Sequence, residues 1–198
     1  IGGRLLFLLE YVPFSRGDLA RSAFSFNQGF SVLGAFGGVT LGLWLFCRRL
    51  NLEFARLLDY VSLAAPFWHF LGRLGCLAAG CCYGRPASLP WAVTFTDPRC
   101  LVAREFLGRP LHPTQLYEAF GELLIGALLY RFALAPLERG RLRPGALSGW
   151  YFVSYGMLRF SIEFFRGDSV PFVLGLTAGQ ALSLALAGLG AAILCTRS

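Results

Sequence analysis

Long apolar segments alternate with polar connections along this chain. The apolar segments cover residues 1–12, 30–47, 57–82, 114–135, 145–165 and 176–195. Most of them approach the roughly 20 residues that a helix needs to cross the hydrocarbon of a bilayer. The pattern therefore predicts an all-α integral membrane protein, a single transmembrane domain over residues 1–198 with a bundle of about six transmembrane helices.

The start of the chain reads as the end of a first span. Ile1 is not a methionine, and it already lies in an apolar run. We therefore expect the chain to be truncated at its N-terminus, with a further N-terminal segment and seven spans in the complete protein.

Composition and charge agree with a place in a bilayer. Hydrophobic residues make up 56% of the chain and charged residues 15%, and the mean hydropathy is +0.58, values typical of integral membrane proteins. All 18 basic residues are arginines, and the net charge is +7. Because the arginines are scattered between apolar segments, nucleic acid is excluded as a partner and anionic lipid is favoured.

Arginines in short loops predict the orientation. Two loops on one side of the membrane carry them: Arg48, Arg49 and Arg56 in one, and Arg139, Arg141 and Arg143 in the other. Positively charged loops stay in the cytoplasm, so this side and the C-terminus are predicted to be cytoplasmic. The connections 13–29, 83–113 and 166–175 then face outward.

Two further features are local. Trp91–Thr96 alternates as a strand does and predicts a short hairpin or flap. Asp59, near the start of the segment 57–82, is expected at the membrane interface.

Arg73 is a charged residue inside an apolar segment. It lies in the stretch Phe70–Arg85, within the segment 57–82. A guanidinium at membrane depth costs roughly 2.5–3.5 kcal/mol on insertion scales and normally faces a cavity or an anionic partner. Arg73 is therefore a candidate site residue.

The fifth segment carries a line of polar residues. Tyr155, Arg159 and Glu163 are spaced four apart and Arg166 follows three later, so all four share one helical face. An Arg159–Glu163 ion pair that only ties helices together is one interpretation. With Arg73, however, the interior arginines outnumber Glu163, and the surplus positive charge suits a phosphate. Both arginines lie towards the outward ends of their segments, so a phospholipid is the expected ligand.

Residues 112–118 open the fourth segment on the same outward side. His112 can titrate near neutrality, as a general base must, although it equally suits a helix-starting position before Pro113. Gln115 and Glu118 are one helical turn apart, and we expect them to hold the arginines in place.

The histidine of the third segment and the cysteines read as packing residues. His69 lies one turn before Arg73, between two aromatic residues. Cys76, Cys81 and Cys82 match no common zinc spacing. The sequence therefore predicts no metal site, and a Cys76–Cys100 disulfide stays open.

Three motifs, in order along the chain, resemble those of the phosphatidylglycerol:prolipoprotein diacylglyceryl transferase family. The first, Gly-Arg-x-Gly-Asn-Phe-x-Asn-x-Glu-x-x-Gly-Arg in the family, matches at Gly72, Arg73, Gly75, Gly84 and Arg85. The second, His-Pro-Ser-Gln-Leu-Tyr-Glu, appears as residues 112–118 with Thr114 in place of Ser. The third, Tyr-Gly-x-x-Arg-x-x-x-Glu-x-x-Arg, is intact over residues 155–166. The similarity covers nearly the whole chain.

The resemblance implies a reaction and the residues that perform it. The diacylglyceryl group of phosphatidylglycerol would move to the lipobox cysteine thiol of a prolipoprotein, releasing glycerol phosphate, at the outer leaflet of the bacterial cytoplasmic (inner) membrane. We expect no cofactor and no metal. The implied catalytic residues are Arg73, Arg159 and His112. The implied substrate-binding residues are Arg73, Gly84, Arg85, Gln115, Tyr117, Glu118, Tyr155, Arg159, Glu163 and Arg166.

Departures from the family pattern leave the acceptor chemistry open. The family's His-Gly-Gly aligns with residues 33–35, where Leu33 replaces the histidine often proposed as the base, and the signature Asn and Glu fall on Cys76 and Cys81. Either His112 or a water path from the outer leaflet replaces the base, or the protein is a paralogue that uses the same phospholipid site with another acceptor. A non-enzymatic phospholipid-binding or transport protein is the alternative from a different class.

Overall fold

The computed structural model describes residues 32–169, 171–173 and 175–196. The first predicted segment, 1–12, and the connection 13–29 lie outside the described residues. The chain divides into two compact parts, residues 1–54 and 55–198.

The first part holds one helix in the described residues. α3 (Val32–Leu50) covers the predicted segment 30–47. It ends where Asn51 takes a positive φ of 51°, a conformation that Asn tolerates better than most residues. The Leu52 N–H then bonds to the Cys47 carbonyl at 2.9 Å. A helix at this segment is thus confirmed.

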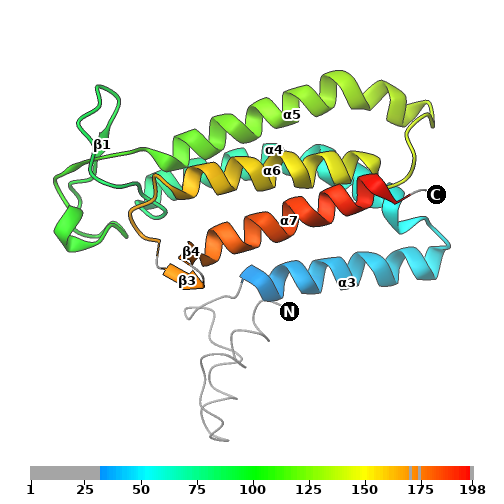
Figure 1. The fold of residues 1–198 in the computed structure, drawn as a ribbon, viewed down its shortest axis with the longest axis horizontal. Helices are drawn as coiled ribbons and strands as arrows, with labels where there is room; N and C mark the ends of the chain where they lie inside the picture. The colour runs from blue at the N-terminus through cyan, green and yellow to red at the C-terminus, as the bar shows by residue number, and fades with distance from the viewer. Residues whose placement is uncertain (1–31, 170, 174, 197–198) are drawn as a thin grey trace, which may run out of the picture. The chain divides into compact units, whose positions relative to one another are not determined.

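Four long helices make up most of the second part (Figure 1). They are α4 (Phe54–Ala79), α5 (Thr114–Glu138), α6 (Ala146–Glu163) and α7 (Ala178–Cys195). The predicted segments 57–82, 114–135, 145–165 and 176–195 differ from them by three residues or fewer at each end. α6 packs against both α5 and α7, and α4 meets α5 through side-chain contacts.

The connection between α4 and α5 has a small core of its own. β1 (Val93–Thr94) pairs antiparallel with β2 (Pro110–Leu111), and a 3-10 turn, η1 (Arg104–Phe106), lies between them. The buried residues of this core are Tyr83, Val102 and Leu111. The strand predicted within Trp91–Thr96 is confirmed. A second short pair, β3 (Pro171–Val173) with β4 (Leu176–Thr177), joins α6 to α7.

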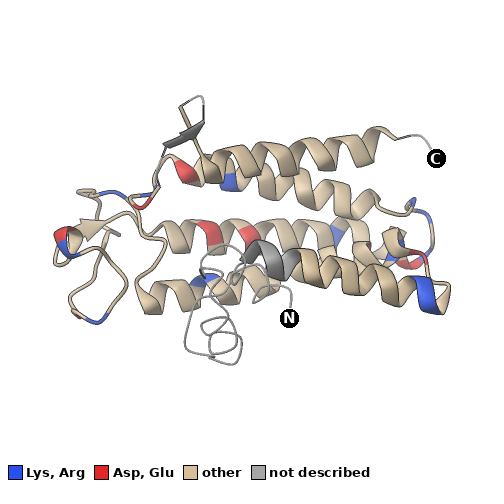
Figure 2. Cartoon of the chain, turned by 90° about the horizontal axis from the view of Figure 1, so that it is seen from below, with Lys and Arg blue, Asp and Glu red and all other residues tan. Residues whose placement is uncertain are grey.

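The helices of the second part expose apolar side chains and bury acidic ones. α5 and α7 are long and apolar enough to cross a membrane. Large exposed apolar residues include Phe120, Leu124, Phe132, Trp150, Met157, Leu182 and Leu189. The buried acidic residues are Asp59, Glu118, Glu122 and Glu163, and most other charged residues lie at the helix ends and in loops (Figure 2). This distribution is typical of a helical protein whose solvent is lipid, while the count of six crossing helices stays a prediction.

Glycines bring α6 and α7 into backbone contact. A Cβ built on Gly156 would lie 2.7 Å from the Ser183 carbonyl oxygen, and one on Gly190 would lie 2.7 Å from the Gly149 carbonyl oxygen. These separations are too short for any side chain, so only glycine fits. Close approach through small residues is a common way to stabilise helix pairs in membranes. We call this contact between α6 and α7 the glycine contact.

Asp59 caps α6 from another helix. Expected at the interface, it is fully buried in protein. Its carboxylate accepts hydrogen bonds from the Gly145 N–H at 2.8 Å and from the Ser148 N–H and hydroxyl, both at 2.9 Å. N–H groups at a helix N-terminus have no partner within the helix, and a carboxylate is favoured there. Local sequence did not predict this role because Gly145 lies 86 residues further along.

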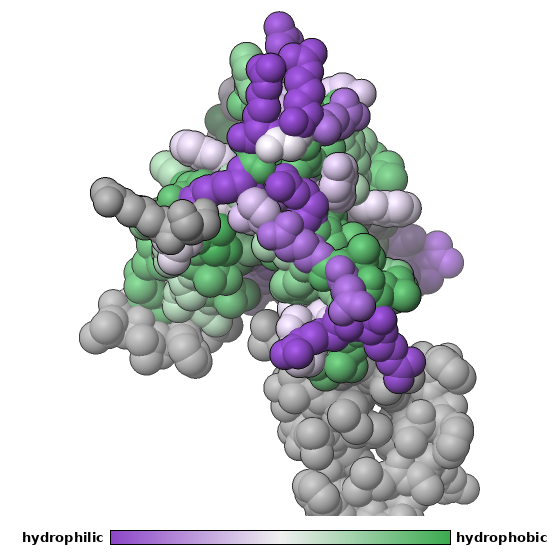
Figure 3. All heavy atoms as spheres, turned by 90° about the vertical axis from the view of Figure 1, so that its right-hand side faces the viewer, coloured by the Kyte–Doolittle hydropathy of each residue, from purple (hydrophilic) through white to green (hydrophobic). Residues whose placement is uncertain are grey.

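Arginines join three segments of the second part at one end. Arg56 Nη1 donates to the Leu142 carbonyl at 2.8 Å, and Arg143 Nη2 donates to the Ile193 carbonyl at 2.8 Å. These bonds tie the start of α4 and the end of α7 to the loop between α5 and α6, and hydrophilic residues gather at this end (Figure 3). The loop with Arg139, Arg141 and Arg143 therefore lies at the end of the helices where α4 starts, whereas Arg85, Arg99, Arg104 and Arg109 lie in the connection that follows the other end of α4. The orientation across a membrane stays a prediction.

Candidate functional site

A buried carboxylate, that of Glu118, joins α4, α5 and α6. Glu118 is only 2% exposed. Its Oε1 accepts a hydrogen bond from Arg73 Nη2 at 2.6 Å and lies 3.9 Å from Arg159 Nε. The Tyr155 hydroxyl donates to the same oxygen at 3.4 Å. Two arginines from separate helices thus meet at one acidic group, as expected for Glu118.

Glu163 holds Arg159 from the other side. Arg159 Nη1 lies 2.5 Å from Glu163 Oε2, and Arg166 Nε lies 3.8 Å from the same oxygen. Glu163 Oε1 accepts hydrogen bonds from the hydroxyls of Ser169 at 2.6 Å and Thr177 at 2.8 Å. Because both oxygens have partners on fixed elements, Glu163 sets the orientation of the Arg159 guanidinium.

Each arginine of the cluster has a carboxylate partner. The pairs are Arg73 with Glu118, Arg159 with Glu163, and Arg166 with Asp168. The predicted surplus of positive charge is therefore wrong, because Glu118 neutralises Arg73. A phosphate must instead use spare donors. A guanidinium has five N–H groups, and the contacts of Arg73 among the described residues are with Glu118 and, at 3.5 Å, with Cys82 Sγ.

Gly84 and Arg85 tie the connection after α4 to the end of α6. The Gly84 N–H donates to the His112 carbonyl at 3.0 Å, and the Arg85 N–H donates to the Phe165 carbonyl at 2.8 Å. A Cβ on Gly84 would overlap His112. Arg85 Nε also donates to the Arg166 carbonyl at 3.0 Å. Both residues therefore position backbone at the site, and their contact with substrate stays a prediction.

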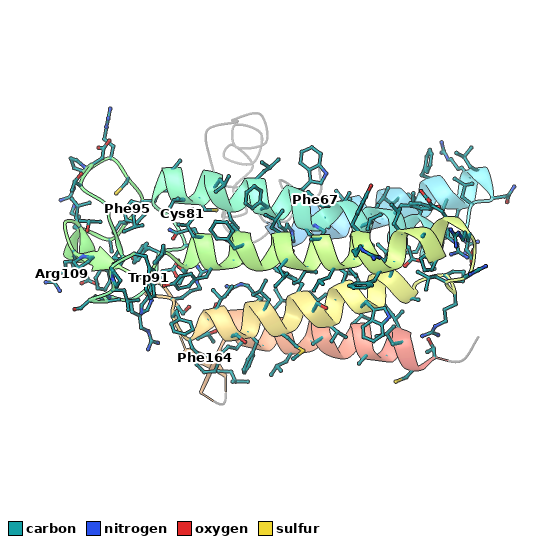
Figure 4. The ribbon with its side chains drawn as sticks, turned by 90° about the horizontal axis from the view of Figure 1, so that it is seen from above. Phe67, Cys81, Trp91, Phe95, Arg109 and Phe164 are labelled. Carbon is teal, nitrogen blue, oxygen red and sulfur yellow. The ribbon has the colours of Figure 1, made fainter. Side chains whose placement is uncertain are left out.

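His112 and Tyr117 line an apolar cavity. His112 Nδ1 lies 3.1 Å from the Tyr117 hydroxyl, which accepts a hydrogen bond from Trp91 Nε1 at 2.9 Å. The cavity holds about 590 Å³ and is lined by Leu89, Trp91, His112, Tyr117, Leu158, Ile162 and Phe165. Trp91 lies at the same end of the molecule as Cys81, whereas Phe67 lies along the helices (Figure 4). Such a lining suits an acyl chain better than a phosphate.

Gln115 and Thr114 hold the residues that follow α4. Gln115 Nε2 donates to the Cys81 carbonyl and Thr114 Oγ1 to the Cys82 carbonyl, both at 2.7 Å. Gln115 was expected to hold an arginine, but its observed partner is backbone. Its effect on Arg73 therefore passes through the segment that carries Cys82.

A second polar layer lies one helical turn from the first. His69 Nδ1 is 2.7 Å from Glu122 Oε1 and 3.0 Å from the Tyr151 hydroxyl. The His69 ring also lies 5.2 Å from the Tyr155 ring. Sequence reasoning treated His69 as packing and missed Glu122 and Tyr151. The signal was their common spacing, because the three lie four residues from Arg73, Glu118 and Tyr155 respectively.

Three thiols meet at the end of α4, one from its last turn and two from the residues that follow it. The Sγ atoms of Cys76, Cys81 and Cys82 lie within 4.8 Å of one another, although their spacing predicts no metal site. Cys76 and Cys100 are both free, so the disulfide that the sequence left open is not formed.

Comparison with known proteins gives the family. The model of a family described as prolipoprotein diacylglyceryl transferase matches residues 1–196 of the 198-residue chain. The chain belongs to this family. Within this chain, the Glu118 cluster unites the three motifs, because Arg73, Glu118 and Arg159 each come from a different one.

Curated relatives share most of this chain. The phosphatidylglycerol-prolipoprotein diacylglyceryl transferase of Zymomonas mobilis is 38% identical over 189 residues, which cover 93% of this chain and 62% of that protein. The proteins of the same name from Ruegeria pomeroyi and Clostridium tetani are 35% and 31% identical over 96% and 93% of this chain, and over 70% of their own lengths in both cases. The chain thus spans between 62% and 70% of the length of these three diacylglyceryl transferases.

Proposed function

We propose that this chain carries the site at which a diacylglyceryl group passes from phosphatidylglycerol to the lipobox cysteine thiol of a prolipoprotein. The observation that carries the proposal is the meeting of Arg73 and Arg159 at the buried Glu118 carboxylate. Charged groups within a membrane bundle are costly and mark functional sites. The names of the relatives supply the donor lipid and the acceptor.

Arg73 and Arg159 hold the phosphate that leaves. The acceptor sulfur attacks the glyceryl carbon, the bond from that carbon to the phosphate oxygen breaks, and its electron pair stays on the oxygen of glycerol phosphate. Donors that are fixed in place before the reaction stabilise this charge without reorganisation. Glu118 and Glu163 fix these donors through contacts of 2.6 Å to Arg73 and 2.5 Å to Arg159.

The protein sits in the bacterial cytoplasmic membrane with this site towards the outer leaflet. The support is the short α5–α6 loop with Arg139, Arg141 and Arg143, which is tied to Arg56 at the start of α4 and to the end of α7. Positively charged loops favour the cytoplasmic side. On this proposal six helices of the chain cross the bilayer and the C-terminus is cytoplasmic.

The decisive test is glycerol phosphate release by the complete protein in phosphatidylglycerol proteoliposomes with a lipobox peptide. A peptide with serine in place of the cysteine is the matched control, and phosphatidylcholine vesicles control for the lipid. We expect release only when both phosphatidylglycerol and the cysteine are present. Phosphatidylglycerol that binds without being consumed would contradict the transferase and favour a lipid-binding protein.

We expect His112→Ala to lower the transfer rate less than about tenfold. A general base contributes roughly 10²–10⁴-fold, but the observed partner of the His112 ring nitrogen is the Tyr117 hydroxyl and its surroundings are apolar. The measurement is the initial rate of release at several pH values, with Tyr117→Phe as the matched change at the other end of the bond. A loss above 100-fold for His112→Ala alone would restore the predicted role of His112 as the base.

A further inference from the structure

The three thiols near Arg73 have the geometry of a metal site with an open position. Zn²⁺ takes cysteine sulfur at about 2.3 Å in a tetrahedron, which separates the sulfur atoms by roughly 3.8 Å. The Sγ atoms of Cys76, Cys81 and Cys82 already lie within 4.8 Å of one another. Side-chain rotation that closes this gap by about 1 Å would give three ligands around one cation.

The end of α4 explains why these thiols converge. The Cys81 N–H bonds to the Cys76 carbonyl at 3.1 Å and the Gly80 N–H to the Leu77 carbonyl at 3.2 Å, which is the Schellman pattern of helix termination. This pattern brings the side chains of Cys76 and Cys81 together, as it would for any apolar pair. Cys82 adds the third thiol by taking a φ of 57°, which is uncommon for a residue other than glycine.

The surroundings of the thiols suit an anionic metal complex. Three thiolates and one divalent cation carry a net charge of −1. Arg73 Nη1 lies 3.5 Å from Cys82 Sγ, so its positive charge offsets that of the complex. The bonds from Gln115 and Thr114 to the carbonyls of Cys81 and Cys82 fix the backbone of two ligands. Such outer contacts orient metal ligands in known sites.

We propose that Cys76, Cys81 and Cys82 bind a zinc-like divalent cation whose fourth position takes the thiol of the acceptor. This role of the cation rests on the proposed function, because the acceptor thiol is the nucleophile of that reaction. Catalytic zinc sites have three protein ligands and one exchangeable position, and a thiol that coordinates the metal is deprotonated outright. Two of the residues that depart from the family signature, Cys76 and Cys81, would thus supply a way to activate the thiol.

The reaction balances without change of oxidation state. The acceptor S–H gives its proton to water as its sulfur coordinates the cation. The sulfur then forms a bond to the glyceryl carbon while the bond from that carbon to the phosphate oxygen breaks. The neutral thioether leaves the metal, and the phosphate leaves with the electron pair. Arg73 contacts both Glu118 and Cys82, so the same guanidinium lies beside the leaving phosphate and the activated thiol.

Metal binding is measured first, independently of turnover. The complete protein is purified, and its zinc content and the thiolate-to-metal charge-transfer absorbance of its Co²⁺ form are recorded. We expect about one metal ion per chain, as one three-cysteine site requires, and loss of most of it in Cys76→Ser and Cys81→Ser. Cys195→Ser is the matched control, because Cys195 lies exposed at the far end of α7. Equal metal content in all of these proteins, or none in the unchanged protein, would overturn the site.

The open position is tested with the acceptor. We expect a lipobox peptide to intensify the Co²⁺ charge-transfer band, and the serine peptide to leave it unchanged. Removing the metal should lower glycerol phosphate release at least about 30-fold at pH 7, because a free thiol is mostly protonated there, and zinc should restore it. Full release by a metal-free or Cys81→Ser protein would contradict the metal's role while leaving the transferase standing. Absence of release from the fully loaded protein would count against the proposed function, and the Co²⁺ spectra would still test the site.

Discussion

Replacing Arg159 with alanine is expected to lower glycerol phosphate release by at least about 100-fold, since loss of one fixed donor to a developing anion typically costs 10²–10³ in rate. Arg159 lies between Glu118 and Glu163, at 3.9 and 2.5 Å. Its removal also leaves Glu163, which is 4% exposed, with one fewer positive partner. Breaking a buried pair in this way costs about 3–5 kcal/mol. The assay is peptide-dependent release in phosphatidylglycerol proteoliposomes.

Two controls separate loss of chemistry from loss of fold. Arg159→Lys keeps the charge but lacks the planar fork, so we expect partial activity. Arg99→Ala removes an exposed arginine whose partner is Asp97, and it should leave the rate unchanged. Size-exclusion profiles in detergent report on folding for all three variants. An Arg159→Ala protein with normal release would refute the proposed site.

Asp59→Ala is expected to give the largest loss of stability. The Asp59 carboxylate is fully buried and accepts hydrogen bonds from the N–H groups of Gly145 and Ser148. Each buried donor left without a partner costs about 1–3 kcal/mol, so the free energy of unfolding should fall by several kcal/mol. The measurement is the midpoint of thermal unfolding in detergent, which drops by roughly 2–4 °C per kcal/mol for a chain of this size.

An exposed aspartate is the matched control for Asp59. Asp97 interacts with Arg99 at the surface, and exposed pairs of this kind contribute little to stability. Asp97→Ala should therefore leave the unfolding midpoint unchanged. If Asp59→Ala unfolded at the same temperature as Asp97→Ala, the cap on α6 would not stabilise the fold.

The elements that follow from local sequence were predictable. The lengths of the apolar segments predicted the bounds of the four long helices of the second part to within three residues. The spacing of Tyr155, Arg159 and Glu163 placed them on one helical face. In the structure, Tyr155 on this face contacts Glu118 of α5, and Arg159 contacts Glu163 one turn away on the same face. Helical periodicity fixes such relations without knowledge of neighbouring helices.

The elements that depend on packing between distant residues were not predictable. The partner of Asp59 is 86 residues away, and Glu118 reaches Arg73 across 45 residues. The three cysteines meet because of a turn after α4 and a positive φ at Cys82, neither of which apolar periodicity reveals. A count of charges on single helices therefore overestimated the positive charge of the site.

The glycine contact between α6 and α7 restricts the routes by which a lipid with two acyl chains can travel. The backbones approach so closely at Gly156 and Gly190 that no space is left between them for an acyl chain. The boundary of α5 and α6 is different, because side chains such as Leu158 and Tyr117 line a cavity there. Side chains can change rotamer and open a space, whereas the glycines between α6 and α7 have no side chain that could move aside. If the proposed function holds, a lipid with two acyl chains would therefore enter along the boundary of α5 and α6 rather than between α6 and α7.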